Sequence, residues 1–218
     1  MYQSVNQIEK SIKDRNGVDV PLTNFWLYIL LLNFLTLGIY GIIMFFKQIG
    51  RIDKFIQRKR PYYQAVADIA ERKMIELNKD ESLISEARDL KKFYEEQFWK
   101  NKEINAGLTL LLTLVTFGLW GFVRLYKQNK AGNELQLFEA EFDERLSRIW
   151  MKAEIIKYPI SFTVNPQKNR NFPLYLGLSL ITFGVWALVW EYKLHTDPDT
   201  LYSGFHSAED MVLQTVRA

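Results

Sequence analysis

Three segments of the chain are apolar almost throughout and carry no charged side chain: 21–46, 105–123 and 171–190. A membrane span needs about 20 apolar residues, so the first segment is long enough and the other two are at the short end of the usable range. In the charged stretches between them, apolar residues recur every three or four positions, which is typical of amphipathic helices. The pattern predicts an all-α membrane protein with three short apolar helical hairpins, re-entrant or spanning, joined by long amphipathic charged helices.

Each apolar segment contains one copy of a hexapeptide, T-[LF]-G-[ILV]-[YW]-[GA]. An aromatic-lysine pair follows each copy, with the lysine eleven residues after the threonine. Threonine bonds locally to the backbone and glycine adopts left-handed conformations, so we expect the T-x-G step to divide each segment into two short helices. In the first segment the halves would be about 18 and 12 Å long, against a hydrocarbon core of about 30 Å. The residues expected at these turns are Thr36, Gly38, Gly41, Thr116, Gly118, Gly121, Thr182 and Gly184.

The repeated flank bears on topology. Three simple spans would alternate in orientation, yet every copy has the same aromatic-lysine pair after it. Spans would also divide the basic residues almost evenly between the two sides, without the usual asymmetry. Re-entrant hairpins, which enter and leave on one face, explain both observations and are favoured. Ordinary spans that use glycine for close helix packing, and a soluble helical protein that buries the three segments, are the alternatives.

The charged stretches are predicted to be helical arms. The first arm, 61–104, has strong helix formers and no glycine, although Asn78-Lys79-Asp80 offers a point at which it could break in two. Pro159 is expected to end the helix of the second arm, before a short extended segment at 161–164. We expect the apolar faces of the arms to pack on each other or on neighbouring subunits.

These elements divide the chain into seven parts, and an asparagine suited to cap a helix stands near the start of each apolar segment, at Asn24, Asn105 and Asn171. The parts are a polar leader (1–20), membrane unit one (21–60), the first helical arm (61–104), membrane unit two (105–130), the second helical arm (131–170), membrane unit three (171–195) and a polar tail (196–218).

Composition and motifs exclude several classes of function. The chain is 48% hydrophobic, and its net charge of +3 is too small to indicate nucleic-acid binding. It has no cysteine, which excludes disulfides and thiolate chemistry, and His195 and His206 lack a metal-ligand spacing. No nucleophile-elbow, phosphate-loop, dinucleotide or zinc-hydrolase motif occurs. We expect no enzymatic activity, cofactor or metal.

Basic residues are dense just after the first apolar segment, as in Arg58-Lys59-Arg60. Basic side chains in such positions bind anionic lipid headgroups. The expected partner is therefore a lipid bilayer, and the expected location is the cell membrane with the arms in the cytoplasm. The residues expected to contact headgroups are Lys47, Arg51, Lys54, Arg58, Lys59, Arg60, Arg124, Lys127 and Lys193.

The T-L-G-I-Y-G core and its aromatic-lysine pair resemble a family of small bacterial and archaeal integral membrane proteins of unknown function. The resemblance covers the apolar segments and about ten residues after each, but not the arms. It implies a prokaryotic membrane protein and supplies no catalytic residues. The third copy departs from the pattern at Ala187 and at Glu191, a carboxylate where the other copies have Phe45 and Leu125.

Three wedges held by rigid arms predict a non-enzymatic membrane scaffold, which forms homo-oligomers through its arms and shapes or organises the bilayer. An unidentified protein partner is compatible with this function. Transport usually places ionisable residues inside the bilayer, and the apolar segments have none. The alternative is a subunit of an oligomeric pore, lined by threonines or by arm residues.

Overall fold

The computed structural model describes residues 2–98, 105–160 and 171–217, and within these ranges the regular structure is helical, with no strand. This confirms the predicted all-α class. The extended segment expected at 161–164 lies outside the described residues. The elements are α1 (Tyr2–Val18), η1 (Leu27–Leu32), α2 (Asn33–Leu35), α3 (Ile39–Glu76), α4 (Glu81–Phe98), α5 (Ala106–Val115), α6 (Leu119–Lys152), α7 (Phe172–Ile181) and α8 (Val185–Arg217).

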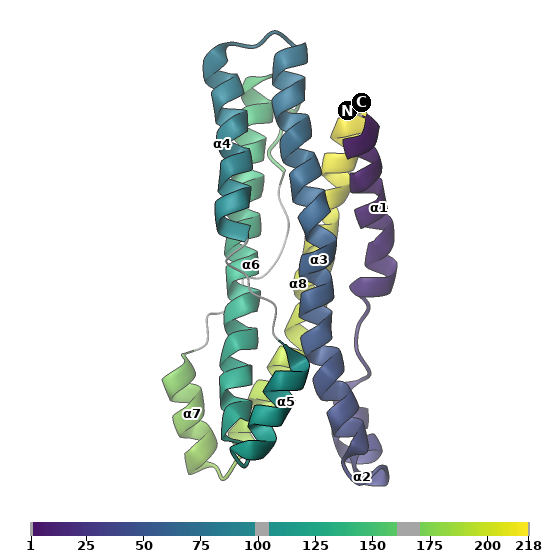
Figure 1. The fold of residues 1–218 in the computed structure, drawn as a ribbon, viewed down its shortest axis with the longest axis vertical. Helices are drawn as coiled ribbons and strands as arrows, with labels where there is room; N and C mark the ends of the chain where they lie inside the picture. The colour runs from purple at the N-terminus through teal and green to yellow at the C-terminus, as the bar shows by residue number, and fades with distance from the viewer. Residues whose placement is uncertain (1, 99–104, 161–170, 218) are drawn as a thin grey trace.

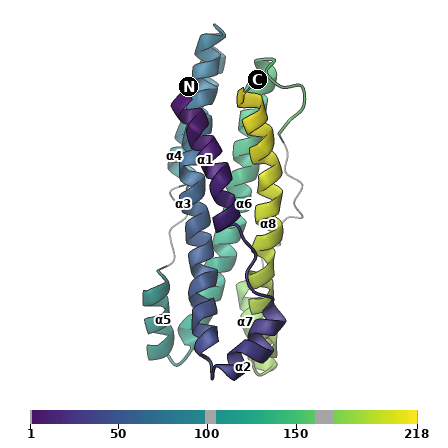
Figure 2. The same cartoon turned by 90° about the vertical axis from the view of Figure 1, so that its right-hand side faces the viewer.

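Three long helices, α3, α6 and α8, run in the same direction along the molecule (Figure 1). Each begins directly after a T-x-G step, so the three turns lie together at one end, the lower end in Figures 1 and 2. Both termini lie at the opposite end, and α1 and α4 pack along the upper part of the long helices. Within the described ranges, no helix combines the length and hydrophobicity needed to cross a bilayer.

Each long helix is paired at its start with a short helix that folds back on it. The pairs are η1 and α2 with α3, α5 with α6, and α7 with α8, and we call them the three hairpins. The second half of each apolar segment is therefore not a separate short helix, as expected, but the first turns of a long one. The boundaries expected after residues 60, 130 and 195 fall inside continuous helices.

The turns have the same backbone geometry in all three hairpins. The first shows it: Leu37 and Gly38 have φ of 48° and 90°, two consecutive left-handed residues. The Thr36 hydroxyl donates to the Leu32 carbonyl at 2.7 Å and accepts from the Tyr40 amide at 2.9 Å, which links the end of one helix to the start of the next. The turn predicted at T-x-G is therefore present, for the predicted reason.

The first hairpin contains one residue more than the others before its turn. Thr36 follows Asn24 by twelve residues, whereas the corresponding interval is eleven in the other two hairpins. The π-helical η1 takes up the additional residue, as single π turns commonly do. Asn24 accepts a hydrogen bond from the Trp26 amide at 3.0 Å, and Asn105 caps α5 by accepting from the Leu108 amide at 2.8 Å.

The arms pack on each other within one subunit. Helices α3 and α4 separate at the predicted break, where Asn78 has a φ of 50°. Aromatic rings fill the space between α3, α4 and α6, with the Tyr63 ring edge-on to Phe142 at 4.9 Å between centroids. Between α3 and α8, Phe55 stacks on Tyr202 at 4.2 Å. Of the two arrangements expected for the arms, the structure has the internal one.

Candidate functional site

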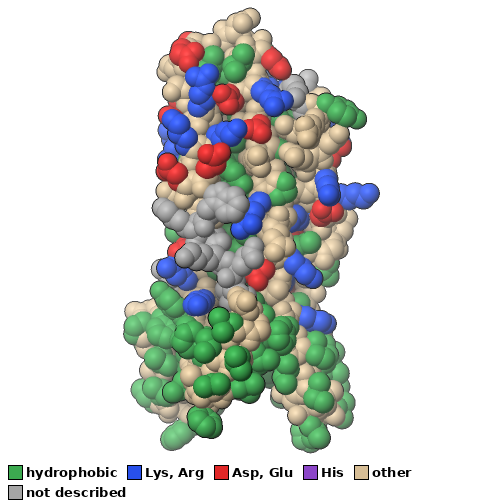
Figure 3. Space-filling model, viewed as in Figure 1, with side chains coloured by type: hydrophobic (Ala, Val, Ile, Leu, Met, Phe, Trp, Pro, Cys, Tyr) green, Lys and Arg blue, Asp and Glu red, His purple; other side chains and the backbone are tan. Residues whose placement is uncertain are grey.

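The end of the molecule that carries the three turns is covered by exposed apolar side chains (Figure 3). We call this surface, formed by the exposed hydrophobic side chains of 26–46, 108–126 and 174–189, the apolar end. At its extremity Leu37, Phe117 and Phe183 are 94%, 98% and 99% exposed, one at each turn. Exposed apolar surface of this extent marks a site of interaction with another molecule.

The short helices of the apolar end have an inverted pattern of burial. The one buried residue of α5 is Thr109 and the one buried residue of α7 is Ser179, while leucines such as Leu111 and Leu180 are exposed. Small hydroxyl residues face the partner helix and large apolar residues face outward. A helix surrounded by water has the opposite pattern, and helices surrounded by lipid pack through small residues in this way.

A level of exposed lysines limits the apolar end. Lys47, Lys127 and Lys193 each lie eight residues into their long helix and are exposed. At 1.5 Å per residue they stand about 12 Å from the starts of α3, α6 and α8. The apolar end therefore has a depth of about 12 Å, set by the same spacing in all three copies.

Two of the predicted headgroup contacts are inside the arm bundle. Arg58 bonds both oxygens of Glu209 at 3.0 Å and Asp19 at 2.7 Å, and Lys59 bonds Glu139 and Glu209 at 2.8 Å. Both basic side chains are buried, because α3 runs through the centre of the bundle and directs this part of its surface at α6 and α8. The expectation that Arg58 and Lys59 contact lipid is corrected accordingly.

The charges of this cluster change one another's proton affinity. Burial alone would lower the pKa of Lys59, but the Glu139 and Glu209 carboxylates raise it above its usual value. Burial would raise the pKa of Glu209, but Lys59 and Arg58 lower it to about 2. Burial, followed by the negative charge of Glu139, holds the pKa of Asp143 well above its usual range. The cluster therefore has two cations opposite carboxyl groups whose pKa values shift in opposite directions, that of Glu209 downward and that of Asp143 upward.

The other predicted headgroup residues, apart from Arg124, are either buried or at the surface. Arg51 is buried and paired with Asp199, so the expectation that it contacts headgroups is also wrong. Lys54 is exposed and Arg60 is partly buried. Together with the three lysines of the 12 Å level, Lys54 and Arg60 are the members of the predicted set with side chains that reach the outer surface.

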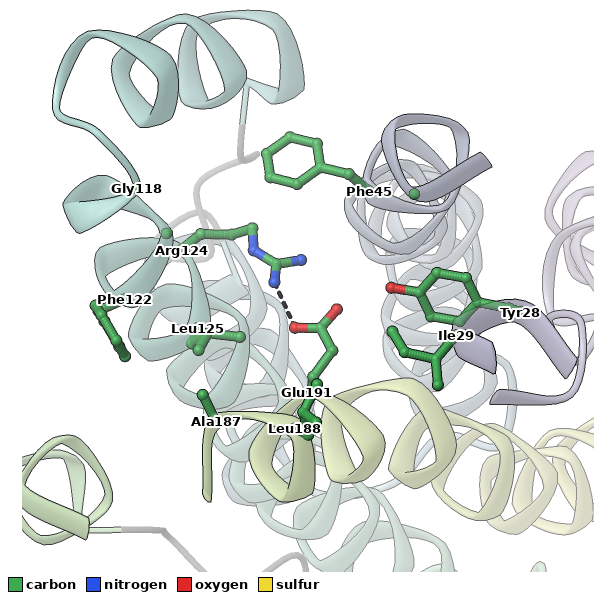
Figure 4. Close-up of a pocket in the computed structure, with 12 residues that line it drawn as sticks. Tyr28, Ile29, Phe45, Gly118, Phe122, Arg124, Leu125, Ala187, Leu188 and Glu191 are labelled. Carbon is green, nitrogen blue, oxygen red and sulfur yellow. Dashed lines mark hydrogen bonds and ion pairs between the residues drawn. The ribbon is translucent and has the colours of Figure 1, made fainter. Parts of the chain in front are cut away.

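Arg124 lies in a cleft between the three hairpins (Figure 4). The cleft has a volume of about 330 Å³, and Tyr28, Phe45, Leu125 and Leu188 are among the residues that line it. Arg124 pairs there with Glu191 of α8 and donates to the Gln48 side chain at 2.9 Å. Its guanidinium lies 5.0 Å from the centre of the Phe45 ring. Burial, with the charge of Glu191, raises the pKa of the Tyr28 hydroxyl to about 12.

A chain of hydrogen bonds extends from the ion pair toward the arms. Gln48 contacts His195 Nδ1 at 3.3 Å, and His195 Nε2 lies 2.7 Å from the Thr23 carbonyl oxygen. Burial lowers the pKa of His195, so the ring is neutral at pH 7, donates from Nε2 and accepts from the Gln48 amide at Nδ1. In the described part of the chain, no group of three potential metal ligands is brought together.

Sequence reasoning missed the Arg124–Glu191 pair. The two residues stand eight and nine positions after the repeat threonine, where the other copies have Met44, Trp190, Phe45 and Leu125. A charged residue at a position that is apolar in the other two copies indicates a specific role. Here position +8 is Arg in the second copy and position +9 is Glu in the third, so the two exceptions have opposite charges. Comparing the copies position by position would have indicated the pair.

No protein-family model, curated protein or solved structure matches this chain. The resemblance of its T-L-G-I-Y-G core to a prokaryotic membrane protein family stays a prediction.

Proposed function

We propose that the protein is a monotopic membrane scaffold, whose three hairpins enter one leaflet of the cell membrane and whose arms stand on its surface. The observation that carries this proposal is the common position of the three turns, each with a fully exposed Leu or Phe, at one end of a molecule that is charged elsewhere.

The depth of the apolar end fits one leaflet. A hydrocarbon core of about 30 Å gives about 15 Å for each leaflet. The lysine level is about 12 Å above the starts of the long helices, and α5 and α7, with 10 residues each, are about 15 Å long. With the turns at the middle of the bilayer, Lys47, Lys127 and Lys193 would reach the anionic headgroups.

The backbone of each turn suits a medium without water. In hydrocarbon every unpaired amide costs several kcal/mol. At the first turn the amides of Leu37, Gly38 and Ile39 donate to the carbonyls of Phe34, Asn33 and Thr36 at 2.8 to 3.2 Å. The second and third turns repeat these bonds. The deepest part of each hairpin therefore has no amide that needs water.

Self-association through the arms has less support than insertion. The apolar faces of the arms are buried inside the subunit. Little apolar surface of the arms is therefore left to drive hydrophobic contact between different subunits. In the proposal, a single subunit holds its three hairpins at fixed spacing. Their insertion increases the area of the leaflet that they enter, but not of the other leaflet.

Flotation with liposomes tests the proposal. The triple variant Leu37→Glu, Phe117→Glu, Phe183→Glu should bind vesicles at least about 100-fold more weakly, since burying each large apolar side chain contributes roughly 2 kcal/mol. The matched control Leu77→Glu, Leu137→Glu, Met151→Glu changes exposed apolar residues of the arms and should float like the unmodified protein. Equal flotation of the two triple variants would overturn the proposal.

A further inference from the structure

We propose that the cleft between the three hairpins binds one membrane phospholipid with a zwitterionic headgroup, whose phosphate bonds Arg124 and whose ammonium bonds Glu191. This inference rests on the proposed function, because the acyl chains would enter the cleft from the surrounding leaflet.

The walls of the cleft suit an acyl chain. They reach from the turn at Gly118 to the ion pair, and their apolar side chains include Ile29, Phe122, Leu125 and Leu188. In Figure 4, Arg124 and Glu191 meet across the cleft from α6 and α8, with Tyr28 and Phe45 of the first hairpin opposite. The arrangement has an apolar channel at one end and two opposite charges at the other.

The glycines of the cleft differ in what they are needed for. A Cβ at Gly41 would come within 2.6 Å of the Asn33 side chain, which accepts a hydrogen bond from the Gly41 amide, so this glycine is required by its neighbour. A Cβ at Gly121 would meet only Thr113, at 3.9 Å. Unlike Gly41, Gly121 is therefore not required by a close neighbour. Because it has no side chain, the part of the cleft that it lines stays open.

The ion pair stands at the depth where the apolar and polar parts of a lipid meet. Arg124 and Glu191 lie five and six residues into their helices, about 8 and 9 Å from the helix starts, just below the lysine level. Lipid chains of the proposed leaflet would lie below the pair and headgroups above it.

The electrostatics of the pair select a headgroup with both signs. Arg124 is 8% exposed and lines the cleft, and of its five N–H groups the bonds to Gln48 and Glu191 use one each. Guanidinium groups bind phosphate through paired, charge-assisted bonds. An anionic headgroup would place its phosphate and the Glu191 carboxylate on one cation, Arg124, which leaves a net negative charge in the cleft. The ammonium of a phosphatidylethanolamine supplies that cation.

Native mass spectrometry of the full-length protein, given equal amounts of phosphatidylethanolamine and phosphatidylglycerol of the same acyl chains, tests the assignment. The unmodified protein should retain one phosphatidylethanolamine, with a preference of about tenfold, the size expected for one charge-assisted bond. Glu191→Gln removes the negative charge that would pair with the ammonium, and it should abolish or reverse the preference. Equal retention of the two lipids by the unmodified protein, or an unchanged preference in Glu191→Gln, would overturn the proposal.

A variant that fills the cleft provides a second readout. Gly121→Leu should lose the retained lipid, whereas the control Gly177→Leu, in α7 and with no atom near its Cβ, should keep it. Both variants should float with liposomes. Flotation together with full lipid retention by Gly121→Leu would overturn the cleft assignment alone. Failure of the unmodified protein to float would overturn the proposed function, and the cleft assignment with it.

Discussion

The arm bundle and the apolar end are built from the same three helices and have opposite surfaces. In the bundle, α3, α6 and α8 direct apolar side chains inward and most charges outward. Below the lysine level the same helices, with their partners, expose leucine and phenylalanine and turn hydroxyl groups inward. The exposed side chains thus change from mostly charged to apolar at one height along three continuous helices, and this change supports the proposal that the apolar end lies in lipid.

The ionic groups sharpen the contrast. The bundle encloses Arg58 and Lys59 among three carboxylates that bond them. At the apolar end, Arg124 has one carboxylate partner and borders a cleft. Buried polar atoms without a hydrogen-bond partner occur in both places, the Nε atoms of Arg58 and Arg124 among them, so the difference between the two sites is the cleft that Arg124 borders.

The largest expected effect is in the bundle. Lys59→Met leaves Glu139 and Glu209 without their shared cation and should lower the free energy of unfolding by about 3–5 kcal/mol. Lys54→Met, on the exposed side of α3, should change it by less than about 0.5 kcal/mol. Urea unfolding followed by circular dichroism measures both. Similar small effects for the two variants would show that the enclosed cluster is not a stabilising feature.

Acid should weaken the bundle through Glu209. Its pKa is about 2 in the folded chain and near 4.3 when unfolded, so its contribution is present above pH 4.3 and is lost as the pH falls toward 2. This corresponds to about 3 kcal/mol. Asp143 has a raised pKa and acts with the opposite sign, so Asp143→Asn should leave the acid limb of a stability–pH curve unchanged and raise stability at neutral pH. An acid limb that is unchanged in Glu209→Gln would contradict this account.

A smaller effect is expected at the turns. Gly38→Ala places a side chain at a φ of 90° and should cost about 1–2 kcal/mol. Gly50→Ala, in the middle of α3 with open space around its Cβ, should instead stabilise the protein by about 0.5–1 kcal/mol. Thermal unfolding of the two variants gives the sign directly, and two effects of the same sign would argue against the left-handed turn.

The smallest effect concerns the lysine level. Lys47→Ala should weaken binding to anionic vesicles by about 1 kcal/mol, and added salt should reduce the difference. Lys54 lies about 10 Å further along α3, close to one Debye length, so Lys54→Ala should have less effect. Flotation at low and high salt measures this. Equal losses for both lysines would place the membrane surface elsewhere along α3.

Local chemistry made the turns and the helical class predictable from sequence. The threonine hydroxyl and the left-handed glycine determine the backbone within a few residues of themselves. The aromatic-lysine pair that follows every copy implies that the three copies have the same orientation. The direction of Arg58 and Lys59 was not predictable in this way. A run of basic residues beside an apolar segment looks like a surface patch, and their partners Glu139 and Glu209 lie on other helices, 80 to 151 residues away. Nothing within α3 indicates that both of its sides are covered.

The most direct measurement of the central claim is the depth of the three turns. Spin labels at Leu37→Cys, Phe117→Cys and Phe183→Cys replace side chains that are at least 94% exposed, in a chain without cysteine, so the fold should tolerate them. In reconstituted bilayers all three should be accessible to oxygen, shielded from a water-soluble nickel reagent and equally deep, while Lys47→Cys should report the headgroup level. A turn label that is accessible to the nickel reagent, or turns at clearly different depths, would contradict insertion of three hairpins into one leaflet.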